Sequence, residues 1–144
     1  MITYKKLYQA ENLKKDEIIL DIETTGLDSL YDQLVLLGLI KYENNKAYIM
    51  QYFAEDNNEE IKLLEVYLRE SKEKNIITYN GDKFDIPFLN IRLDKHKLVP
   101  TFPETKDVYK LISSKRKYFE FESMKLTDIE KHIGIFRNDP SRYK

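Results

Sequence analysis

The chain has 144 residues, 42% hydrophobic and 34% charged, a composition typical of a globular domain rather than a disordered segment. The absence of cysteine excludes disulfides, thiolate metal sites and a cysteine nucleophile, and a formal net charge of -1 gives no bulk signal for nucleic-acid binding. With no signal-peptide core and no apolar run of the roughly 18 residues that a membrane helix needs, we expect a single cytoplasmic domain spanning residues 1–144.

The first half of the chain contains three segments that predict strands. Residues 18–22 are mostly aliphatic, residues 33–40 form a long apolar run, and residues 46–53 form a third candidate. The polar residues 43–45 predict a hairpin turn between the second and third strands. These three strands are expected to form an antiparallel meander.

A helix and a short strand are predicted next. The helix begins near Asn57, a suitable cap, and Glu60 follows three residues later, as in a capping box. Residues 75–79 are rich in β-branched side chains and predict a short strand. A second helix is expected from Asp85, with Pro87 in its first turn.

The last part of the chain predicts one irregular segment and two helices. Residues 98–103 contain two prolines and predict a loop or an edge strand. Helices are predicted for residues 107–117 and 124–133, the latter ended by Gly134. This order favours an α/β fold with a mixed sheet flanked by helices, in which the meander is followed by parallel strands reached through helical crossovers.

The most informative motif is a pair of acids at the end of the first predicted strand. Asp21 and Glu23 are separated by one residue, so on a strand their side chains point to the same face. Two neighbouring carboxylates raise each other's pKa, and partial burial adds to that cost. A bound divalent cation would relieve the repulsion, and oxygen ligands of this kind suit Mg²⁺ or Mn²⁺.

A third carboxylate is expected near this pair. The strand of residues 75–79 should lie beside the first strand, and Asn80-Gly81 turns the chain at its end. Asp85, at the start of the next helix, would then reach the same cleft, although it could serve only as a helix cap. Three carboxylates around one or two divalent ions are an arrangement used for phosphodiester hydrolysis.

These motifs resemble those of the DEDD superfamily of 3′→5′ exonucleases, which have a ribonuclease H-like fold. Residues 21–27, Asp-Ile-Glu-Thr-Thr-Gly-Leu, resemble the first motif, and Asn80-Gly81 with Phe84-Asp85 resembles the second. The spacing Asn-Gly-x-x-Phe-Asp-x-Pro after Tyr79 is similar to the YprB-like branch of predicted ribonuclease H-like exonucleases. Further matches to that branch are residues 37–38, 107–109, 126–130 and 134–139.

The resemblance implies a role for each matched position. Asp21, Glu23 and Asp85 would be catalytic ligands of Mg²⁺ or Mn²⁺, holding two ions if the site is complete and one if it is not. Asn80 would shape the loop of the second motif. The turn that meets the 3′-terminal nucleotide would comprise Thr24, Thr25, Gly26 and Leu27, with Leu27 against the terminal base.

One part of the superfamily's pattern is not found. The superfamily uses a fourth acid with a Tyr or His base, in this branch His-Asn-x-x-Asp on a late helix, and neither His96 nor His132 is followed by such an Asp. We therefore expect a ribonuclease H-like domain that lacks its C-terminal catalytic helix. Its open apolar sheet face would be covered by a second copy or by a partner chain.

The implied function is a divalent-metal-dependent 3′→5′ exonuclease domain that hydrolyses single-stranded DNA or RNA, weakened by the lack of the fourth acid. The alternative is a catalytically inactive module of the same fold that binds nucleic acid or protein; no membrane partner is expected. For Asp107, His96 and His132, the sequence favours structural roles over catalytic ones. The basic residues between positions 90 and 117 could line a phosphate track or form a solvated helix face, and the sequence leaves both open.

Overall fold

The computed structural model describes residues 1–10, 12 and 14–137. The chain divides into two compact units, Met1–Asp107 and Val108–Lys144. In the described part of the chain, no helix has the length and apolar character needed to cross a lipid bilayer. The expectation of one domain over residues 1–144 stays a prediction.

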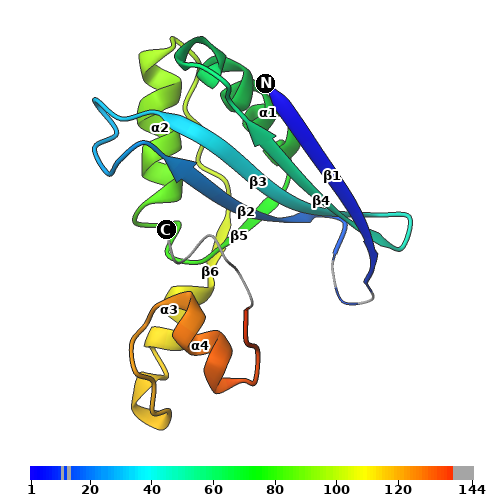
Figure 1. Cartoon of the computed structure of the whole chain (residues 1–144), viewed down its shortest axis with the longest axis vertical. Coiled ribbons are helices and arrows are strands. Elements are labelled where there is room, and N and C mark those ends of the chain that lie inside the picture. The colour runs from blue at the N-terminus through cyan, green and yellow to red at the C-terminus, as the bar shows by residue number, and fades with distance from the viewer. Residues whose placement is uncertain (11, 13, 138–144) are drawn as a thin grey trace. The chain divides into compact units, whose positions relative to one another are not determined.

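The first unit is built on a mixed sheet that has six strands within the described residues, in the order β1-β4-β3-β2-β5-β6 (Figure 1). The strands are β1 (Ile2–Gln9), β2 (Glu17–Thr24), β3 (Leu34–Glu43), β4 (Lys46–Phe53), β5 (Asn75–Thr78) and β6 (Thr105–Asp107). Strands β2, β3 and β4 form an antiparallel meander, and β5 joins β2 in parallel with Ile18 beside Ile76. The predicted mixed sheet and its central topology are confirmed.

Strand β1 was not among the predicted elements. It pairs antiparallel with β4 at the edge of the sheet, and all its residues are exposed. With neither face buried, the strand has only a short alternation of apolar and polar residues, which ends at Lys5-Lys6 and is too brief to identify it. At the opposite edge, residues 98–103 form a loop, and the short strand β6 begins only at Thr105.

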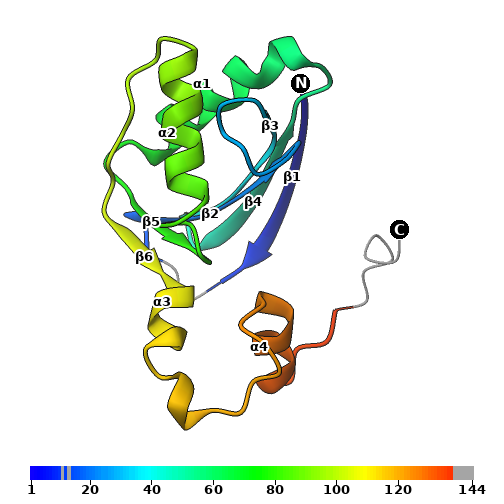
Figure 2. The ribbon, with the colours of Figure 1, turned by 90° about the vertical axis from the view of Figure 1, so that its left-hand side faces the viewer.

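Two helices cover one face of this sheet (Figure 2). They are α1 (Glu60–Ser71), preceded by the 3-10 turn η1 (Asn57–Glu59), and α2 (Asp85–Lys95). The cap is Asp56 rather than Asn57, because the Asp56 carboxylate accepts a hydrogen bond from the Asn58 amide at 2.8 Å.

The core lies between these helices and the sheet. Ile18, Leu20 and Ile22 alternate along β2 and point into it, so Asp21 and Glu23 lie on the other face. Full burial of a side chain such as Leu or Ile is worth about 1.5–3 kcal/mol. Other core members are Leu37 and Leu39 of β3, Leu63, Leu64 and Tyr67 of α1, and Phe88, Leu89 and Leu93 of α2.

The face of Asp21 carries several exposed apolar side chains. Cross-strand register places Asp21 beside Gly38, Gly38 beside Gln51, and Gln51 beside Tyr4, so these residues share one face. Tyr4 is 52% exposed and Phe53, two residues along from Gln51, is 44% exposed. An apolar patch on this face agrees with expectation, and its partner stays a prediction.

The second unit contains short helices. They are α3 (Val108–Ser113), the 3-10 turn η2 (Arg116–Tyr118) and α4 (Leu126–His132). The predicted helix 107–117 therefore ends early, whereas the predicted helix 124–133 corresponds to α4 and is followed by Gly134 at φ +88°. His132 packs edge-on against Phe119 and Phe121, the packing role expected of it. Asn138 and Asp139 of the last matched segment lie outside the described residues.

Candidate metal and nucleotide site

The second motif forms a tight turn between β5 and α2. Asn80 has φ +63°, and a Cβ at Gly81 would lie 2.4–2.5 Å from side-chain atoms of Thr78. Only glycine fits at position 81 without displacing Thr78, a β-branched residue with limited rotamers. The Ile86 amide then donates to the Gly81 carbonyl at 2.9 Å as α2 begins. The sequence-based choice of a strand-to-helix turn over a hairpin is confirmed.

Asp107 fixes this turn from the end of β6. It is 4% exposed, and its two carboxylate oxygens accept hydrogen bonds from the amides of Asn80 at 2.7 Å and Asp82 at 3.3 Å. The expected structural role is thus correct, although its nature differs: Asp107 precedes α3 and binds a turn 25–27 residues away in the sequence. A contact so distant in sequence has no local signal.

Asp85 brings the two motifs together. It is the first residue of α2 and is 6% exposed. Its carboxyl accepts a hydrogen bond from the backbone N–H of Ile22, the residue between Asp21 and Glu23. This contact is available because β5 ends at Thr78 and its described pairing with β2 stops at Ile19, which leaves the end of β2 accessible to the start of α2.

The electrostatics of Asp85 reflect this position. Burial first, and then the negative charge of Asp21, raise the pKa of Asp85 to about 7, with Asp107 adding a smaller effect. Hydrogen bonds from the N–H groups of Asp85 itself and of Ile22 lower the pKa but do not compensate. Near neutral pH, Asp85 is therefore about half protonated.

A divalent cation suits part of this arrangement. Asp21 and Asp85 offer hard oxygen donors whose mutual repulsion a cation would relieve. Among the described residues, however, no three His, Asp or Glu side chains are gathered so that they could hold a metal ion. The structure therefore brings Asp21 and Asp85 together, while Glu23 remains an exposed neighbour of Asp21 on the same face of β2. The three-ligand metal site stays a prediction.

The predicted nucleotide turn follows directly after β2. The Thr24 hydroxyl donates to the Gly26 carbonyl at 2.6 Å. The Thr25 hydroxyl accepts a hydrogen bond from the Gln33 amide at 2.9 Å, at the other end of the loop. Leu27 is 85% exposed at the tip of the turn. The turn is thus ordered by its own polar groups and leaves Leu27 in solvent.

Asp32 organises this loop and was not singled out from the sequence. A Cβ at Gly26 would lie 2.3 Å from its Oδ2 atom, so glycine allows the Asp32 carboxylate to sit against the turn. The same Oδ2 accepts the Asp28 amide at 2.9 Å, and Oδ1 accepts the Thr25 hydroxyl at 3.3 Å. The i, i+4 spacing of Asp28 and Asp32 is the one sequence signal for this loop structure.

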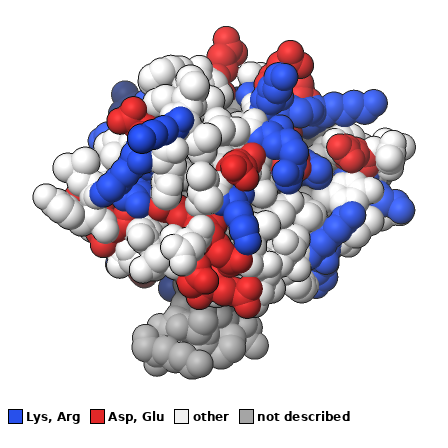
Figure 3. All heavy atoms as spheres, turned by 90° about the horizontal axis from the view of Figure 1, so that it is seen from above, with Lys and Arg blue, Asp and Glu red and all other residues white. Residues whose placement is uncertain are grey.

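The basic residues between positions 90 and 117 do not act as one group. Arg92 is 4% exposed and forms an ion pair with buried Glu60, so it cannot line a phosphate track. On the face shown in Figure 3, Lys and Arg side chains are interspersed with Asp and Glu rather than forming a band of one sign. A phosphate track along the remaining basic residues stays a prediction.

Comparison with known proteins places the chain in a family. A sequence model described as RNase_H superfamily matches residues 18–142. The DNA polymerase III PolC-type of Mycoplasma pneumoniae is 28% identical over 105 residues, which are 58% of this chain and 7% of the polymerase. Membership of the ribonuclease H superfamily is therefore shown, while the DEDD exonuclease group, its YprB-like branch and the lack of a late catalytic helix stay predictions.

Solved structures share the fold. Exonuclease I of E. coli, in complex with a dA16 oligonucleotide, matches with a TM-score of 0.63 at 15% identity, over 85% of this chain and 37% of that chain. Brucella melitensis NrnC bound to pGG matches with a TM-score of 0.56 at 19% identity, over 90% of this chain and 59% of that chain. The chain spans less than two thirds of each of these proteins, and the predicted ribonuclease H-like fold is confirmed.

Proposed function

The protein belongs to the ribonuclease H superfamily, and from that premise we propose that it is a divalent-metal-dependent 3′→5′ exonuclease domain acting on single-stranded DNA or RNA. Asp21, Glu23 and Asp85 would hold Mg²⁺ or Mn²⁺. The turn of residues 24–27 would contact the 3′-terminal nucleotide. The proposal places all of these groups in the first compact unit.

One observation carries the proposal: the buried Asp85 carboxyl lies close enough to the first motif to interact with the charge of Asp21 and with the backbone N–H of Ile22. An acid pair held close in a partly buried position destabilises a folded chain unless a cation or a proton neutralises it. Structural roles need no such pair. A carboxyl whose pKa is raised to about 7 by burial and by Asp21 is typical of a functional site.

Side chains and backbone groups of the protein would bind and orient the 3′ end of the nucleic-acid strand. When bound, a divalent cation would polarise the terminal phosphodiester and lower the pKa of the attacking water. In the hydrolysis, the water oxygen bonds to phosphorus as the bond to the 3′ oxygen of the penultimate nucleotide breaks. The products are a nucleoside 5′-monophosphate and a nucleic-acid strand shortened by one nucleotide. The new 3′ oxygen of that strand takes up a proton.

The nucleotide-binding part of the proposal rests on the loop and on the similar proteins. Leu27 is 85% exposed on a turn fixed by the Thr24 and Thr25 hydroxyls, so an apolar side chain is presented to solvent on an ordered backbone. Exonuclease I and NrnC were both solved with nucleic-acid ligands, dA16 and pGG. Those ligands support the end of a nucleic-acid strand as the substrate of this protein.

A catalytically inactive nucleic-acid-binding module is the second candidate. It is favoured by the lack, among the described residues, of an assembled group of three possible metal ligands. Binding without turnover would distinguish it from the exonuclease.

The test is a degradation assay with 3′-ended and 3′-blocked oligonucleotides of DNA and RNA in Mn²⁺. We expect the wild type to shorten only the strands with a free 3′ end, and Asp21→Ala and Glu23→Ala to lose at least about a hundredfold in rate, because metal assistance is worth several kcal/mol. Asp94→Ala, an exposed acid on α2, is the matched control and should behave as wild type. Activity that survives both motif substitutions would overturn the proposal, and binding without cleavage would favour the inactive module.

A further inference from the structure

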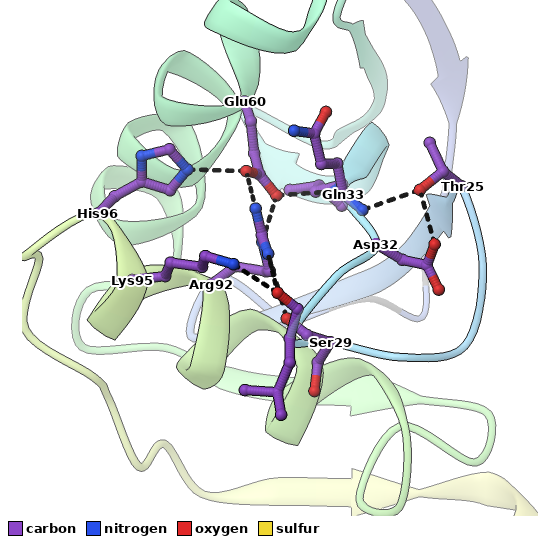
Figure 4. Close-up of polar contacts among 10 residues, drawn as sticks. Thr25, Ser29, Asp32, Gln33, Glu60, Arg92, Lys95 and His96 are labelled. Atoms are coloured by element: carbon purple, nitrogen blue, oxygen red, sulfur yellow. Dashed lines mark hydrogen bonds and ion pairs between the residues drawn. The ribbon is translucent and has the colours of Figure 1, made fainter.

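A buried ion pair joins the two helices of the first unit (Figure 4). Glu60, the first residue of α1, is 1% exposed, and Arg92 of α2 is 4% exposed. The pair is bidentate: Arg92 Nε donates to Glu60 Oε1 at 2.8 Å and Nη2 donates to Oε2 at 2.7 Å. His96, at the C-cap of α2 one turn after Arg92, places its Nε2 2.7 Å from the same Oε2.

This pair needs an explanation beyond stability. Burial alone would raise the pKa of Glu60, but hydrogen bonds from Arg92, His96 and the Leu34 amide outweigh it, so the pKa is lowered and the carboxylate is charged. Replacing a buried ion pair by apolar side chains of similar size is often neutral or stabilising. The charged pair is therefore explained better by the other contacts that the side chains of Glu60 and Arg92 make.

The remaining donors of this cluster hold the loop after the first motif. Arg92 Nη1 donates to the backbone carbonyls of Ser29 at 3.2 Å and Leu30 at 3.5 Å. The Lys95 ammonium donates to the same Leu30 carbonyl. At the end of the loop, the Leu34 amide donates to Glu60 Oε1 at 2.8 Å. Both the middle and the end of loop 25–33 are thus tied to α1 and α2, as Figure 4 shows.

The loop that is held so firmly exposes large apolar side chains. Leu27 is 85% exposed, Leu30 56% and Tyr31 81%. Inside the loop, the Asp28 carbonyl accepts the amides of Tyr31 and Asp32. Exposed apolar groups on a fixed backbone contribute little to folding, but they lower the entropy cost of binding a ligand that they fit.

We propose that Arg92 is a positioning residue that holds loop 25–33 as a preformed surface, on which Tyr31 stacks with a nucleobase of the single strand. The inference rests on the proposed function, which supplies the ligand class. Aromatic side chains bind the bases of single strands by stacking, with little dependence on base identity. A nucleobase is therefore a ligand that the exposed Tyr31 ring fits.

Helix α2 links the loop to the proposed metal site. Asp85 begins the helix and Arg92 lies two turns later, about 10 Å along the helix axis at 1.5 Å per residue. One rigid element therefore carries both a proposed metal ligand and the group that holds the loop. The same helix therefore sets the distance between the loop and the proposed metal ligand Asp85.

The first variant for the test is Glu60→Met/Arg92→Met, which removes both charges together and so leaves no unpaired buried charge. Its matched control is Lys41→Met/Glu70→Met, which removes a second ion pair, of 3.2 Å, that joins β3 to α1. Hydrogen exchange measures the loop directly and does not depend on any nuclease activity. We expect the amides of Tyr31 and Asp32 to exchange at least about tenfold faster in the first variant and unchanged in the control.

The second readout is binding and turnover of a 3′-ended oligonucleotide. Binding is measured with phosphorothioate terminal linkages, which slow cleavage. In the Glu60→Met/Arg92→Met variant we expect affinity to fall and KM to rise about tenfold, with kcat within about twofold, because the loop binds the strand without touching the reacting atoms. A merely structural ion pair would change the melting temperature without this split between KM and kcat.

Tyr31 is tested by a double-mutant cycle. Tyr31→Ala should weaken binding about 5- to 100-fold in the wild type, the range of one stacked base, while Tyr31→Phe should bind as the wild type does. In the Glu60→Met/Arg92→Met background the same substitution should cost less than about threefold. Phe102→Ala, another exposed aromatic in the first unit at 87%, is the control and should leave binding unchanged.

Four results would overturn the inference. Loop exchange and affinity both unchanged in a folded Glu60→Met/Arg92→Met protein would remove the positioning role of Arg92. Equal losses from Tyr31→Ala in both backgrounds would remove the link between the two residues. If the wild type degrades strands and Tyr31→Ala binds them as well as the wild type does, stacking by Tyr31 is excluded and the proposed function stands. If the wild type neither binds nor degrades strands, the proposed function is excluded as well.

Discussion

Two buried carboxylates, Glu60 and Asp85, begin the two helices of the first unit, and their surroundings are opposite. Glu60 is met by Arg92, His96 and the Leu34 amide, which lower its pKa despite burial. For Asp85, burial and then the negative charges of Asp21 and Asp107 raise the pKa to about 7. The same chain therefore neutralises one buried acid internally and places the other among further acids.

The difference separates structural charge from functional charge. The Glu60 cluster is complete in itself and fixes the geometry of a loop. The Asp85 cluster reduces stability as it stands and would gain from an added cation. Stability measurements can therefore test the two assignments without any assay of activity.

The largest effect should come from Arg92→Ala. This substitution leaves the Glu60 charge buried without its main partner, and breaking a buried pair in this way typically costs about 3–5 kcal/mol. The free energy of unfolding from urea titration measures the loss. Arg69→Ala on the exposed side of α1 is the control, with an expected change within about 0.5 kcal/mol. Equal effects of the two substitutions would show that Glu60 does not depend on Arg92.

The opposite sign is expected for Asp85→Asn. The asparagine Oδ1 can still accept the Ile22 amide, but the repulsion from Asp21 is removed. Because the pKa is raised from its ordinary 3.8 to about 7 by folding, the wild type loses stability as pH rises from about 4 to 7. At pH 8 the substitution should therefore stabilise the protein, by up to about 4 kcal/mol.

The pH dependence provides the check on this prediction. Thermal melts of wild type and Asp85→Asn should differ most above pH 7 and converge below about pH 3, where the wild-type carboxyl is protonated in both the folded and the unfolded state. An advantage of the variant that is constant between pH 4 and 8 would mean that charge repulsion is not its cause. A variant less stable than wild type at pH 8 would contradict the raised pKa.

A smaller loss is expected for Asp107→Ala. The substitution removes the acceptor for the Asn80 and Asp82 amides, and unsatisfied buried donors cost about 1–3 kcal/mol. Asp107→Asn retains an acceptor oxygen and should recover part of the loss. Urea titration distinguishes the two, and equal stability of both variants and wild type would exclude Asp107 as the group that holds the turn.

The smallest change should follow Lys95→Ala. Lys95 is exposed, and its ammonium bonds a single carbonyl of the loop. Unfolding free energy should stay within about 0.5 kcal/mol of wild type, as for most surface substitutions. A loss as large as that of Arg92→Ala would show that the exposed part of the cluster, rather than the buried ion pair, holds the loop.

The central sheet was accessible to sequence reasoning because its strands carry their own patterns. Residues 18–22 and 33–40 are apolar runs bounded by polar turns, and Asn80-Gly81 marks the end of β5. Strand β1 was missed because neither of its faces is buried. Local pattern identifies an element when one face is buried, and it fails at an exposed edge.

The candidate site was predictable to a similar degree. Asp21, Glu23 and Asp85 stand in recognisable motifs, and the parallel neighbourhood of β2 and β5 brings Asp85 to Ile22. Glu60 was assigned to a capping box from its local spacing, yet its partners Arg92 and His96 lie 32 and 36 residues away. The one sequence signal for that cluster was the spacing of Arg92 and His96, one helical turn apart at the end of α2.

The central claim, a divalent-cation site at Asp21, Glu23 and Asp85, is tested most directly by calorimetric titration of Mn²⁺ at pH 7 in two buffers that differ in ionisation enthalpy. We predict heat of binding for the wild type, with release of a fraction of a proton as the cation displaces the proton held by Asp85. Asp21→Ala should bind far more weakly, and Asp94→Ala should bind as the wild type does. No heat with the wild type, or the same heat with Asp21→Ala, would contradict the account.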